Sequence, residues 1–272
     1  MKIKSNEYMY TKSLGVFSDL ADKLIGKDNV KYIVEIGARD CRETLAFQDN
    51  FSRAEIYTFE CNPDTLPLCR ERVANISNIH LIEKAVSDKD GKLTFYQTDN
   101  EKTKTSRPDG NPGASSLFKA NPDYPLEKYV QKEITVDSTT LSSFCREVGL
   151  SQIDLMWLDI QGAELMALKA AGDYLSKIKL IHTEVEFYKV YMDQPLYKDI
   201  RNYLAENGFR LVTFASFGKY AADAIFVNTK LIPVKTWPEP LLFSYEWLKE
   251  KITGKSRGAM LKLKRYLARP TV

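Results

Sequence analysis

Short apolar runs rich in β-branched residues alternate with segments of helical spacing along this chain of 272 residues, and few folds accommodate that order. The runs are continuously apolar, which is typical of strands buried on both faces of a parallel sheet. The alternation of strand and helix therefore predicts a mostly parallel sheet with right-handed crossovers. The expected strands are 31–36, 55–60, 79–83, 153–159 and 180–185, and the expected helices are about 41–50, 64–75, 138–149 and 163–175.

The order changes after residue 194. Pro195 near its start and Gly208 just past its end bracket a further helix at about 194–207. The next two expected strands, 209–214 and 224–227, are too close in sequence for a parallel crossover, so they should pair as a hairpin. The prediction is an α/β fold with a seven-stranded, mostly parallel sheet that ends in an antiparallel hairpin.

Composition divides the chain into an N-terminal helical segment (1–30), a main domain (31–240) and a basic amphipathic tail (241–272). One loop at about 98–131, with four prolines and two glycines, interrupts the main domain between strands expected at 92–97 and 133–136. A loop this long inside a compact domain is usually functional or disordered. We expect a lid over a ligand site, with a disordered insertion or a dimer contact as alternatives. The oligomeric state is not predicted.

Charge is distributed unevenly along the chain. Eight Lys or Arg and one acid lie between residues 249 and 269, whereas the whole chain has a formal net charge of +3, so the remainder is mildly acidic. The tail is predicted to lie on an anionic membrane surface, with a solvated helix packed on its own domain as the alternative. The acidic body predicts no nucleic-acid partner.

The chain lacks the features of secreted and multi-histidine metal proteins. No segment approaches the ~20 apolar residues that span a bilayer, and the first residues lack the apolar core of a secretory signal. The four cysteines (41, 61, 69 and 145) show no paired spacing, and only two histidines are present. We therefore expect reduced thiols and a cytoplasmic location, peripheral to the membrane if the tail binds it.

The first candidate site is the turn after the first strand, which runs Glu35-Ile-Gly37-Ala38-Arg39. Ligands of open parallel sheets bind beyond the carboxyl ends of the strands, and a glycine there lets backbone approach the ligand. The turn lacks the three glycines of a dinucleotide site, and Glu35 would repel phosphate but suit a cationic ligand. An ordinary strand–helix turn is the alternative.

Two further turns fit a nucleoside. Glu60, followed by Cys61 and Asn62, ends the second strand, where a carboxylate accepts ribose hydroxyls. Ala85 and Val86 follow the third strand, at the expected edge of an adenine ring. The alternative for Glu60 is an acid that caps the next helix, and the alternative for Ala85 and Val86 is a plain loop.

Ionisable residues end the fourth and fifth strands. Asp159 is placed at the topological switch point, or acts as a helix cap. Strand alternation places His182, Glu184 and Glu186 on one face, which favours proton transfer or cation binding. A hydrogen-bonded core histidine is the alternative for His182.

The order and spacing of these motifs over about residues 31–213 resemble the FkbM-like S-adenosylmethionine-dependent methyltransferases. This sequence departs from the commoner pattern at Arg39-Asp40, at Trp157 in place of a frequent Lys, and at Gln161 in place of a frequent Glu. The motifs that carry the resemblance are Glu35-Ile-Gly37-Ala38, Phe59-Glu60-x-Asn62-Pro63, Ala85-Val86-Ser87-Asp88-x-x-Gly91, Ser115-Ser116-Leu117, Leu158-Asp159-Ile160-Gln161-Gly162-Ala163-Glu164 and Glu184.

The resemblance implies a Rossmann-like class I methyltransferase fold and O-methylation, often of sugar or natural-product hydroxyls. It implies that Glu35 and Gly37, within a turn that includes Ala38 and Arg39, cradle the methionine part of S-adenosylmethionine. Glu60, beside Cys61 and Asn62, would hold the ribose, Ala85 and Val86 would line the adenine, and Asp159 would lie at the methyl-transfer centre.

The mechanism hypothesis is in-line attack of a substrate hydroxyl on the methyl group. His182 or Glu184 would act as base, or Asp159 and Glu184 would hold Mg²⁺ that binds the hydroxyl. Ser115, Ser116 and Tyr124 are the candidate contacts to a sugar or glycan acceptor. A non-catalytic nucleoside-binding or partner-binding subunit and an NAD-dependent oxidoreductase are the alternatives.

Overall fold

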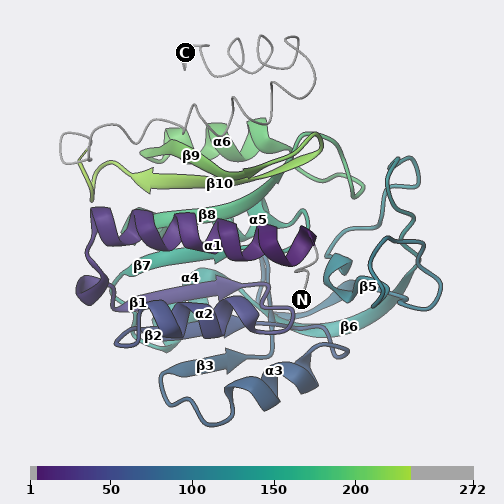
Figure 1. The fold of residues 1–272 in the computed structure, drawn as a ribbon, viewed down its shortest axis with the longest axis horizontal. Helices are drawn as coiled ribbons and strands as arrows, with labels where there is room; N and C mark the ends of the chain where they lie inside the picture. Colours follow the sequence, from purple (N-terminus) through teal and green to yellow (C-terminus); the bar gives the residue numbers. More distant parts are fainter. Residues whose placement is uncertain (1–4, 234–272) are drawn as a thin grey trace.

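The computed structural model describes residues 5–233, with side chains from residue 12 onward. A seven-stranded sheet forms the middle layer (Figure 1). Its strands are β1 (Tyr32–Ile36), β2 (Glu55–Phe59), β3 (Ile79–Ile82), β7 (Ile153–Leu158), β8 (Ile178–Glu186), β9 (Phe209–Phe217) and β10 (Ala221–Asn228).

The strand order is β3-β2-β1-β7-β8-β10-β9. Strands β1, β2, β3, β7 and β8 are parallel, and β10 runs antiparallel to both β8 and β9. The order reverses between β1 and β7, where Glu35 lies opposite Trp157. The carboxyl ends of these two strands therefore form the topological switch point, which is the usual ligand site of such sheets.

Helices cover both faces of this sheet (Figure 1). Phe17 and Phe47 pack with Trp157 on one face, whereas Phe144 and Leu168 belong to the core on the other. Each large apolar side chain that is fully buried contributes ~1.5–3 kcal/mol to folding. The first face carries α1 (Ser5–Leu24), α2 (Arg42–Asn50) and α3 (Leu66–Val73), and the second carries α4 (Leu141–Glu147), α5 (Glu164–Ala170) and α6 (Tyr197–Glu206).

A second, three-stranded sheet lies beside the carboxyl ends of the main strands. It consists of β4 (Ala85–Val86), β5 (Gly91–Thr98) and β6 (Gln131–Thr139), in the order β4-β6-β5. The loop between β5 and β6 contains the short 3-10 helix η2 (Pro112–Ala114). The sequence predicts β5 and β6 but not β4, because two residues carry too little periodicity.

The predicted fold class is confirmed: the seven expected strands occur in the Rossmann-like order, and the last two form the hairpin. The expected helix at 138–149 begins later, because β6 extends to Thr139 and Thr140 caps α4 by accepting from the Ser143 N–H. The expected helix at 163–175 is divided into α5 and the 3-10 helix η3 (Gly172–Lys177).

The ends of the chain are described unequally. In the segment 1–30, α1 packs Leu14, Phe17 and Leu20 onto the sheet, and the 3-10 helix η1 (Lys27–Asn29) follows. The basic tail predicted at 241–272 lies outside the described residues, and its membrane contact stays a prediction. Within residues 5–233, no helix combines the length and apolarity needed to cross a membrane.

Candidate functional site

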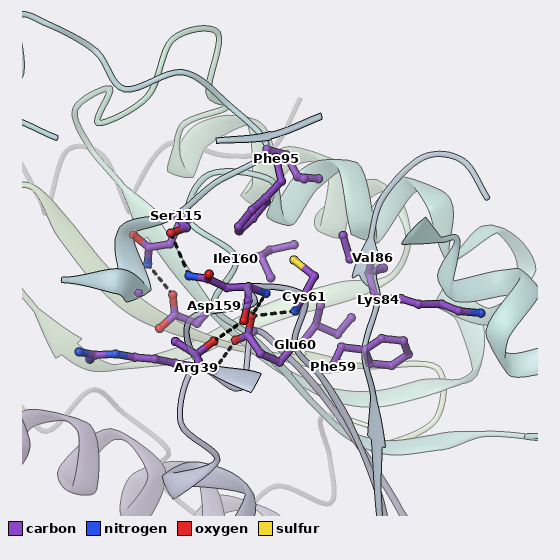
Figure 2. Close-up of a pocket in the computed structure, with 18 of the residues that line it drawn as sticks. Arg39, Phe59, Glu60, Cys61, Lys84, Val86, Phe95, Ser115, Asp159 and Ile160 are labelled. Carbon is purple, nitrogen blue, oxygen red and sulfur yellow. Dashed lines mark hydrogen bonds between the residues drawn. The ribbon is translucent and has the colours of Figure 1, made fainter. Parts of the chain in front are cut away.

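A cleft opens at the carboxyl ends of β1, β2 and β7 (Figure 2). Its empty volume is about 560 Å³, including space open to solvent. Turns after the strands supply one side, and the loop between β5 and β6 supplies the other. Of the predicted cofactor residues, those that line the cleft are Gly37, Arg39, Glu60, Cys61, Asn62, Ala85, Val86 and Asp159.

Gly37 fixes the base of the cleft. Its φ of +94° is in the left-handed region, and a Cβ there would lie 1.9 Å from the carbonyl oxygen of Asp159. Only glycine permits this approach of the turns after β1 and β7. The N–H groups of Gly37 and Ala38 both donate to the Phe59 carbonyl, at 3.0 and 2.9 Å, so Ala38 shapes the turn but does not line the cleft.

Glu60 is a carboxylate that lines the cleft just after β2 (Figure 2). Its Oε1 accepts from the backbone N–H groups of Cys61 and Asn62, and its Oε2 accepts from that of Arg39, each at 2.7 Å. Burial raises the pKa of this carboxyl, and the three N–H groups oppose the rise by stabilising the charged form. The arrangement holds one carboxylate rigidly against the cleft.

Glu35 does not face the cleft. Its side chain is fully buried and accepts hydrogen bonds from Thr44 of α2 and, at 2.7 Å, from Thr58 of β2. Burial raises the pKa of Glu35 to about 8, so the carboxyl is neutral at pH 7. The structure therefore gives Glu35 a bracing position behind the turn, instead of the expected contact with the methionine end of a cofactor.

One side of the cleft is lined by apolar side chains. Ala85 and Val86 of β4 line it with Phe59 and Phe95, and Cys61 lies beside them (Figure 2). Burial raises the pKa of the Cys61 thiol well above its usual range, so the thiol is neutral and inert. Aromatic and aliphatic walls of this kind suit a planar heterocycle.

At the opposite side, two half-buried acids meet through one amide. Gln161 Nε2 donates to Asp159 Oδ1 at 2.7 Å and to Glu184 Oε2 at 2.9 Å. Asp159 lines the cleft, whereas Glu184 lies behind it on β8. Desolvation raises the pKa of both carboxyls. The charge of Asp159 raises the pKa of Glu184 further, whereas hydrogen bonds from Gln161 and Glu184 oppose the rise at Asp159, so Glu184 retains a proton more readily than Asp159 does.

These acids do not fit a metal ion. Among residues 5–233, no group of three or more His, Cys, Asp or Glu is arranged to hold one. The facing oxygens of Asp159 and Glu184 already accept from Gln161. The Mg²⁺ predicted at Asp159 and Glu184 therefore has no support in the described part of the chain.

His182 lies away from the cleft and receives no catalytic role. It is 1% exposed, and its ring stacks on Trp157 with centroids 3.4 Å apart. The hydroxyl of Ser13 in α1 donates to Asp223 at 2.8 Å, so the His182 Nε2, 3.0 Å from the same oxygen, must be a donor. Burial lowers the pKa of His182 to about 4, which keeps the ring neutral.

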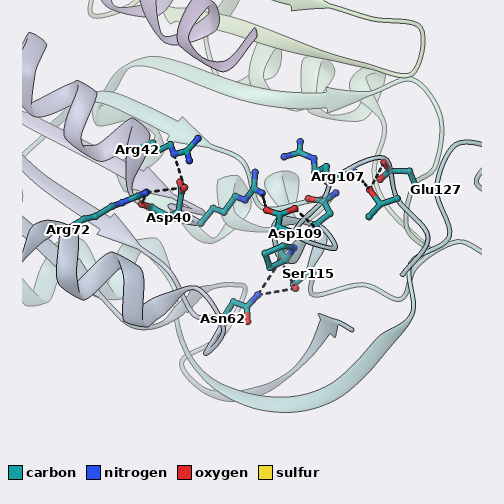
Figure 3. A network of polar contacts seen from close by, with 12 residues as sticks. Asp40, Arg42, Asn62, Arg72, Arg107, Asp109, Ser115 and Glu127 are labelled. Carbon is teal, nitrogen blue, oxygen red and sulfur yellow. Dashed lines mark hydrogen bonds and ion pairs between the residues drawn. The ribbon is translucent and has the colours of Figure 1, made fainter. Parts of the chain in front are cut away.

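The loop at 98–131 forms one wall of the cleft. Asn62 Nδ2 donates to the Pro112 carbonyl at 3.2 Å and to Ser115 Oγ at 3.1 Å, and Arg39 pairs with Asp109 at 2.7 Å (Figure 3). The loop thus rests on the turns after β1 and β2. Its outer ion pair is solvent-exposed and contributes little by itself.

The predicted acceptor residues of the loop have contacts within the protein. Ser115 Oγ donates to the Pro112 carbonyl at 2.8 Å, and Ser116 Oγ donates to the Gln161 carbonyl at 2.7 Å. Both hydroxyls therefore hold the loop in place, although Ser115 also lines the cleft. Tyr124 is 8% exposed and belongs to a tyrosine cluster, which we define as Tyr124, Tyr129, Tyr188, Tyr191 and Tyr220.

The tyrosine cluster joins the loop to the segment after β8. Tyr129 stacks on Tyr191 with ring centroids 6.3 Å apart, and Tyr124 contacts Tyr188 and Tyr220. Tyr188 is 40% exposed. Burial, and after it the carboxyls of Glu127, Glu184 and Glu186, raise the pKa of Tyr124, so these acids lie near the cluster.

Sequence reasoning missed several of these residues. Phe95 was predicted only as part of a strand, and Gln161 was named only as part of a motif. No sequence feature pointed to Tyr191. Tyr191 and Gln161 are 30 positions apart, and only the folded chain brings them to 3.0 Å. The proline-rich composition did mark the loop, but not which of its residues meet the cleft.

The strand order and the glycine and carboxylate turns define a Rossmann-like class I methyltransferase. The family described as "Methyltransferase FkbM domain" matches residues 35–211, which is more than half of the chain. The chain belongs to this FkbM methyltransferase family.

The chain is also similar to a protein described as "2-O-methyltransferase NoeI" of Sinorhizobium fredii (strain NBRC 101917 / NGR234). The two are 29% identical over 227 residues, which cover 81% of this chain and 88% of NoeI. Among solved structures, this chain resembles the methyltransferase domain of METTL16, with 11% identity, a TM-score of 0.46 and coverage of 79% of this chain and 67% of that chain. It also resembles Aeropyrum pernix fibrillarin with bound S-adenosyl-L-methionine (12% identity, TM-score 0.44, 79% and 76%). Likenesses this distant add nothing to what the sheet itself shows.

Proposed function

We propose that this chain is an S-adenosylmethionine-dependent O-methyltransferase that acts on a hydroxyl group of a sugar. The observation that carries the proposal is the position of Asp159, which lines the nucleoside-shaped cleft and is linked through Gln161 to Glu184 beside the tyrosine cluster. The description of NoeI as a 2-O-methyltransferase supports transfer to oxygen.

The cleft fits the cofactor in shape and charge. Glu60 would accept from the ribose hydroxyls, Ala85 and Val86 would contact the adenine, and the Gly37 turn would face the amino-acid end. S-adenosylmethionine would supply a methyl group activated by a positively charged sulfur. The carboxylates of Glu60 and Asp159 favour such a cation, whereas the single-glycine turn provides poorly for a dinucleotide pyrophosphate.

Asp159 is the proposed base. An alcohol is a weak acid, so a carboxylate within hydrogen-bond reach must take its proton as the oxygen–carbon bond forms. Two hydrogen bonds favour the ionised form of Asp159, from Gln161 and from the protonated carboxyl of Glu184. Glu184 therefore keeps the shared proton at neutral pH, and Asp159 receives the proton of the acceptor.

The tyrosine cluster is the proposed acceptor surface. Tyrosine rings pack against the C–H faces of sugar rings, while phenol and carboxyl groups hydrogen-bond the hydroxyls. Tyr188 offers an exposed ring beside the buried ring of Tyr124. The carboxylate of Glu127 accepts from the Tyr129 hydroxyl of this cluster, and hydrogen bonds hold its pKa below the usual value, so its negative charge favours an uncharged sugar over a phosphorylated or uronic one.

Two other functions remain as outcomes of the same test. A nucleoside-binding subunit without activity would bind the cofactor and transfer nothing. An NAD-dependent oxidoreductase would bind NAD in preference, although membership of a methyltransferase family favours methyl transfer.

The test is release of S-adenosylhomocysteine by the purified full chain, given methyl-labelled S-adenosylmethionine and a panel of neutral, phosphorylated and uronic sugars. We expect label on a neutral sugar, a loss of ~10²–10⁴-fold in Asp159→Asn, and no change in Asp173→Asn, whose residue is exposed on η3. Cofactor binding without transfer to any sugar would favour the inactive subunit, and full turnover by Asp159→Asn would reject the proposed base.

A further inference from the structure

Gln161 has an unusual backbone and an unusually complete set of partners. Its φ is +54°, a left-handed conformation that few residues other than glycine and asparagine adopt readily. Its amide bridges Asp159 and Glu184, and its Oε1 lies 3.0 Å from the Tyr191 hydroxyl. A strained backbone that aims one side chain at three polar groups is typical of a functional position.

The same residue touches the loop that walls the cleft. Ser116 Oγ donates to the Gln161 carbonyl at 2.7 Å. The Tyr191 hydroxyl, which contacts the Gln161 amide, also lies 2.8 Å from the carbonyl oxygen of Ala114 in η2. Gln161 is therefore joined to the loop directly through its backbone carbonyl, and its side-chain oxygen shares the single hydrogen of the Tyr191 hydroxyl with the Ala114 carbonyl of the loop.

We propose that Gln161 is a positioning residue that couples docking of the 98–131 loop to the orientation and charge of Asp159. This inference rests on the proposed function for its catalytic meaning, but not for its structural content. One NH₂ group supplies one hydrogen to each acid, so both carboxyls stay close without a cation between them. Loss of the loop contacts would release the amide and with it the hydrogen bond that favours the charged form of Asp159.

A glutamate at this position would act differently from Gln161. It would add a third carboxyl against Asp159 and Glu184, and it would donate to only one of them, and only when protonated. The neutral amide instead lowers the charge density of an acidic region. Seven titratable groups surround Asp159: Glu43 of α2, Arg107 of the loop, Glu164 of α5, Glu184 and Glu186 of β8, Tyr191 after β8, and Asp223 of β10.

The experiment is a pH titration of the full chain labelled with ¹³C at the aspartate carboxyls, with the Asp159 signal assigned by its loss in Asp159→Asn. Gln161→Leu removes both donated hydrogen bonds, and we expect the Asp159 midpoint to rise by about one pH unit. Gln161→Asn suits the left-handed backbone but is one methylene too short, so it should fold well and shift in the same direction.

Loop variants separate coupling from local support. Ser116→Ala and Tyr191→Phe should each raise the Asp159 midpoint, by less than Gln161→Leu does. Thr105→Ala is the matched control, because the Thr105 hydroxyl is in the same loop but bonds to Glu127. An unchanged midpoint in both Gln161 variants would overturn the proposal, even if their melting temperatures fell. Equal midpoints in Ser116→Ala, Tyr191→Phe and Thr105→Ala would overturn the coupling.

The readout does not depend on turnover, so it distinguishes the two hypotheses. If no sugar is methylated but the midpoint shifts, the proposed function fails and the positioning role stands. Where a sugar is methylated, the rising limb of the pH–kcat profile should shift with the midpoint while KM for the cofactor changes less than threefold. A loss confined to KM would contradict positioning of the base.

Discussion

The change Glu60→Gln tests the cofactor assignment with little change in shape. The carboxylate of Glu60 accepts from three backbone N–H groups: Oε1 from Cys61 and Asn62, and Oε2 from Arg39, each at 2.7 Å. An amide has one oxygen. In its better orientation the new amide accepts from the Cys61 and Asn62 N–H groups with its oxygen. Its NH₂ group then faces the Arg39 N–H, so two donors oppose each other.

The magnitude follows from this geometry. A hydrogen bond to a charged group contributes ~1.5–3 kcal/mol, and the opposed donors at Arg39 move the turn that forms the cleft. The ribose would also meet an amide in place of a carboxylate. A combined loss of ~2–3 kcal/mol in cofactor binding corresponds to about 30- to 150-fold in Kd.

Calorimetric titration with S-adenosylhomocysteine measures the effect. Glu55→Gln is the matched control, because Glu55 begins β2, the strand that Glu60 follows, its side chain is 45% exposed and it pairs with His80. We expect the control to bind as the unaltered chain does. If folded Glu60→Gln binds within threefold of the unaltered chain, the assignment of Glu60 to the ribose is refuted.

Three stability predictions concern buried positions, each measured by urea unfolding. Gly37→Ala places a Cβ 1.9 Å from the Asp159 carbonyl oxygen at a φ of +94°. We therefore expect the free energy of unfolding to fall by at least ~3 kcal/mol, and a fall of less than about 1 kcal/mol would contradict the stated contact. Glu35, whose pKa is raised from 4.5 to about 8, takes up a proton on folding. Stability relative to Glu35→Gln should therefore fall by up to ~1.4 kcal/mol per pH unit between those values and level off outside them; a constant difference would show that Glu35 is not protonated. Ser13→Ala removes the hydroxyl between His182 and Asp223 and should cost ~1–3 kcal/mol. Ser18→Ala on the same helix should cost much less, since the buried Ser18 Oγ has no partner among the described residues, and equal losses would contradict the role of the bridge.

The sheet could be predicted because its strands are apolar on both faces. All six residues of β7 are buried, and such a run has few other interpretations. Chain order then places Glu60 and Asp159 at strand ends that meet at one edge. Strand order alone predicts that the residues at these ends lie together, so the sequence was sufficient to predict them.

The expectation that His182 lies at the site was wrong because alternation predicts which face of a strand a residue occupies, but not what covers that face. Alternation places His182 and Glu184 on the same side of β8, but His182 is nearer the start of the strand and lies under α1, where Ser13 and Trp157 enclose it. The strand carries no signal of what covers it. Glu35 illustrates the same limit, because its Thr44 and Thr58 partners belong to elements whose relative placement appears only in the fold.

The position of the loop insertion has a mechanical consequence. It connects β5 and β6 of the small sheet, so changes in the loop need not disturb the seven strands that carry the cofactor turns. Yet it contacts the carboxyl ends of four of them, at Arg39 after β1, at Asn62 after β2, at Gln161 after β7 and at Tyr191 after β8. An insertion anchored in this way can vary on its outer side while its inner contacts hold the turn that carries Asp159, the proposed base. Substitutions at the outer tyrosines should therefore change which sugar is accepted, whereas substitutions at Ser116 should change how fast any sugar reacts.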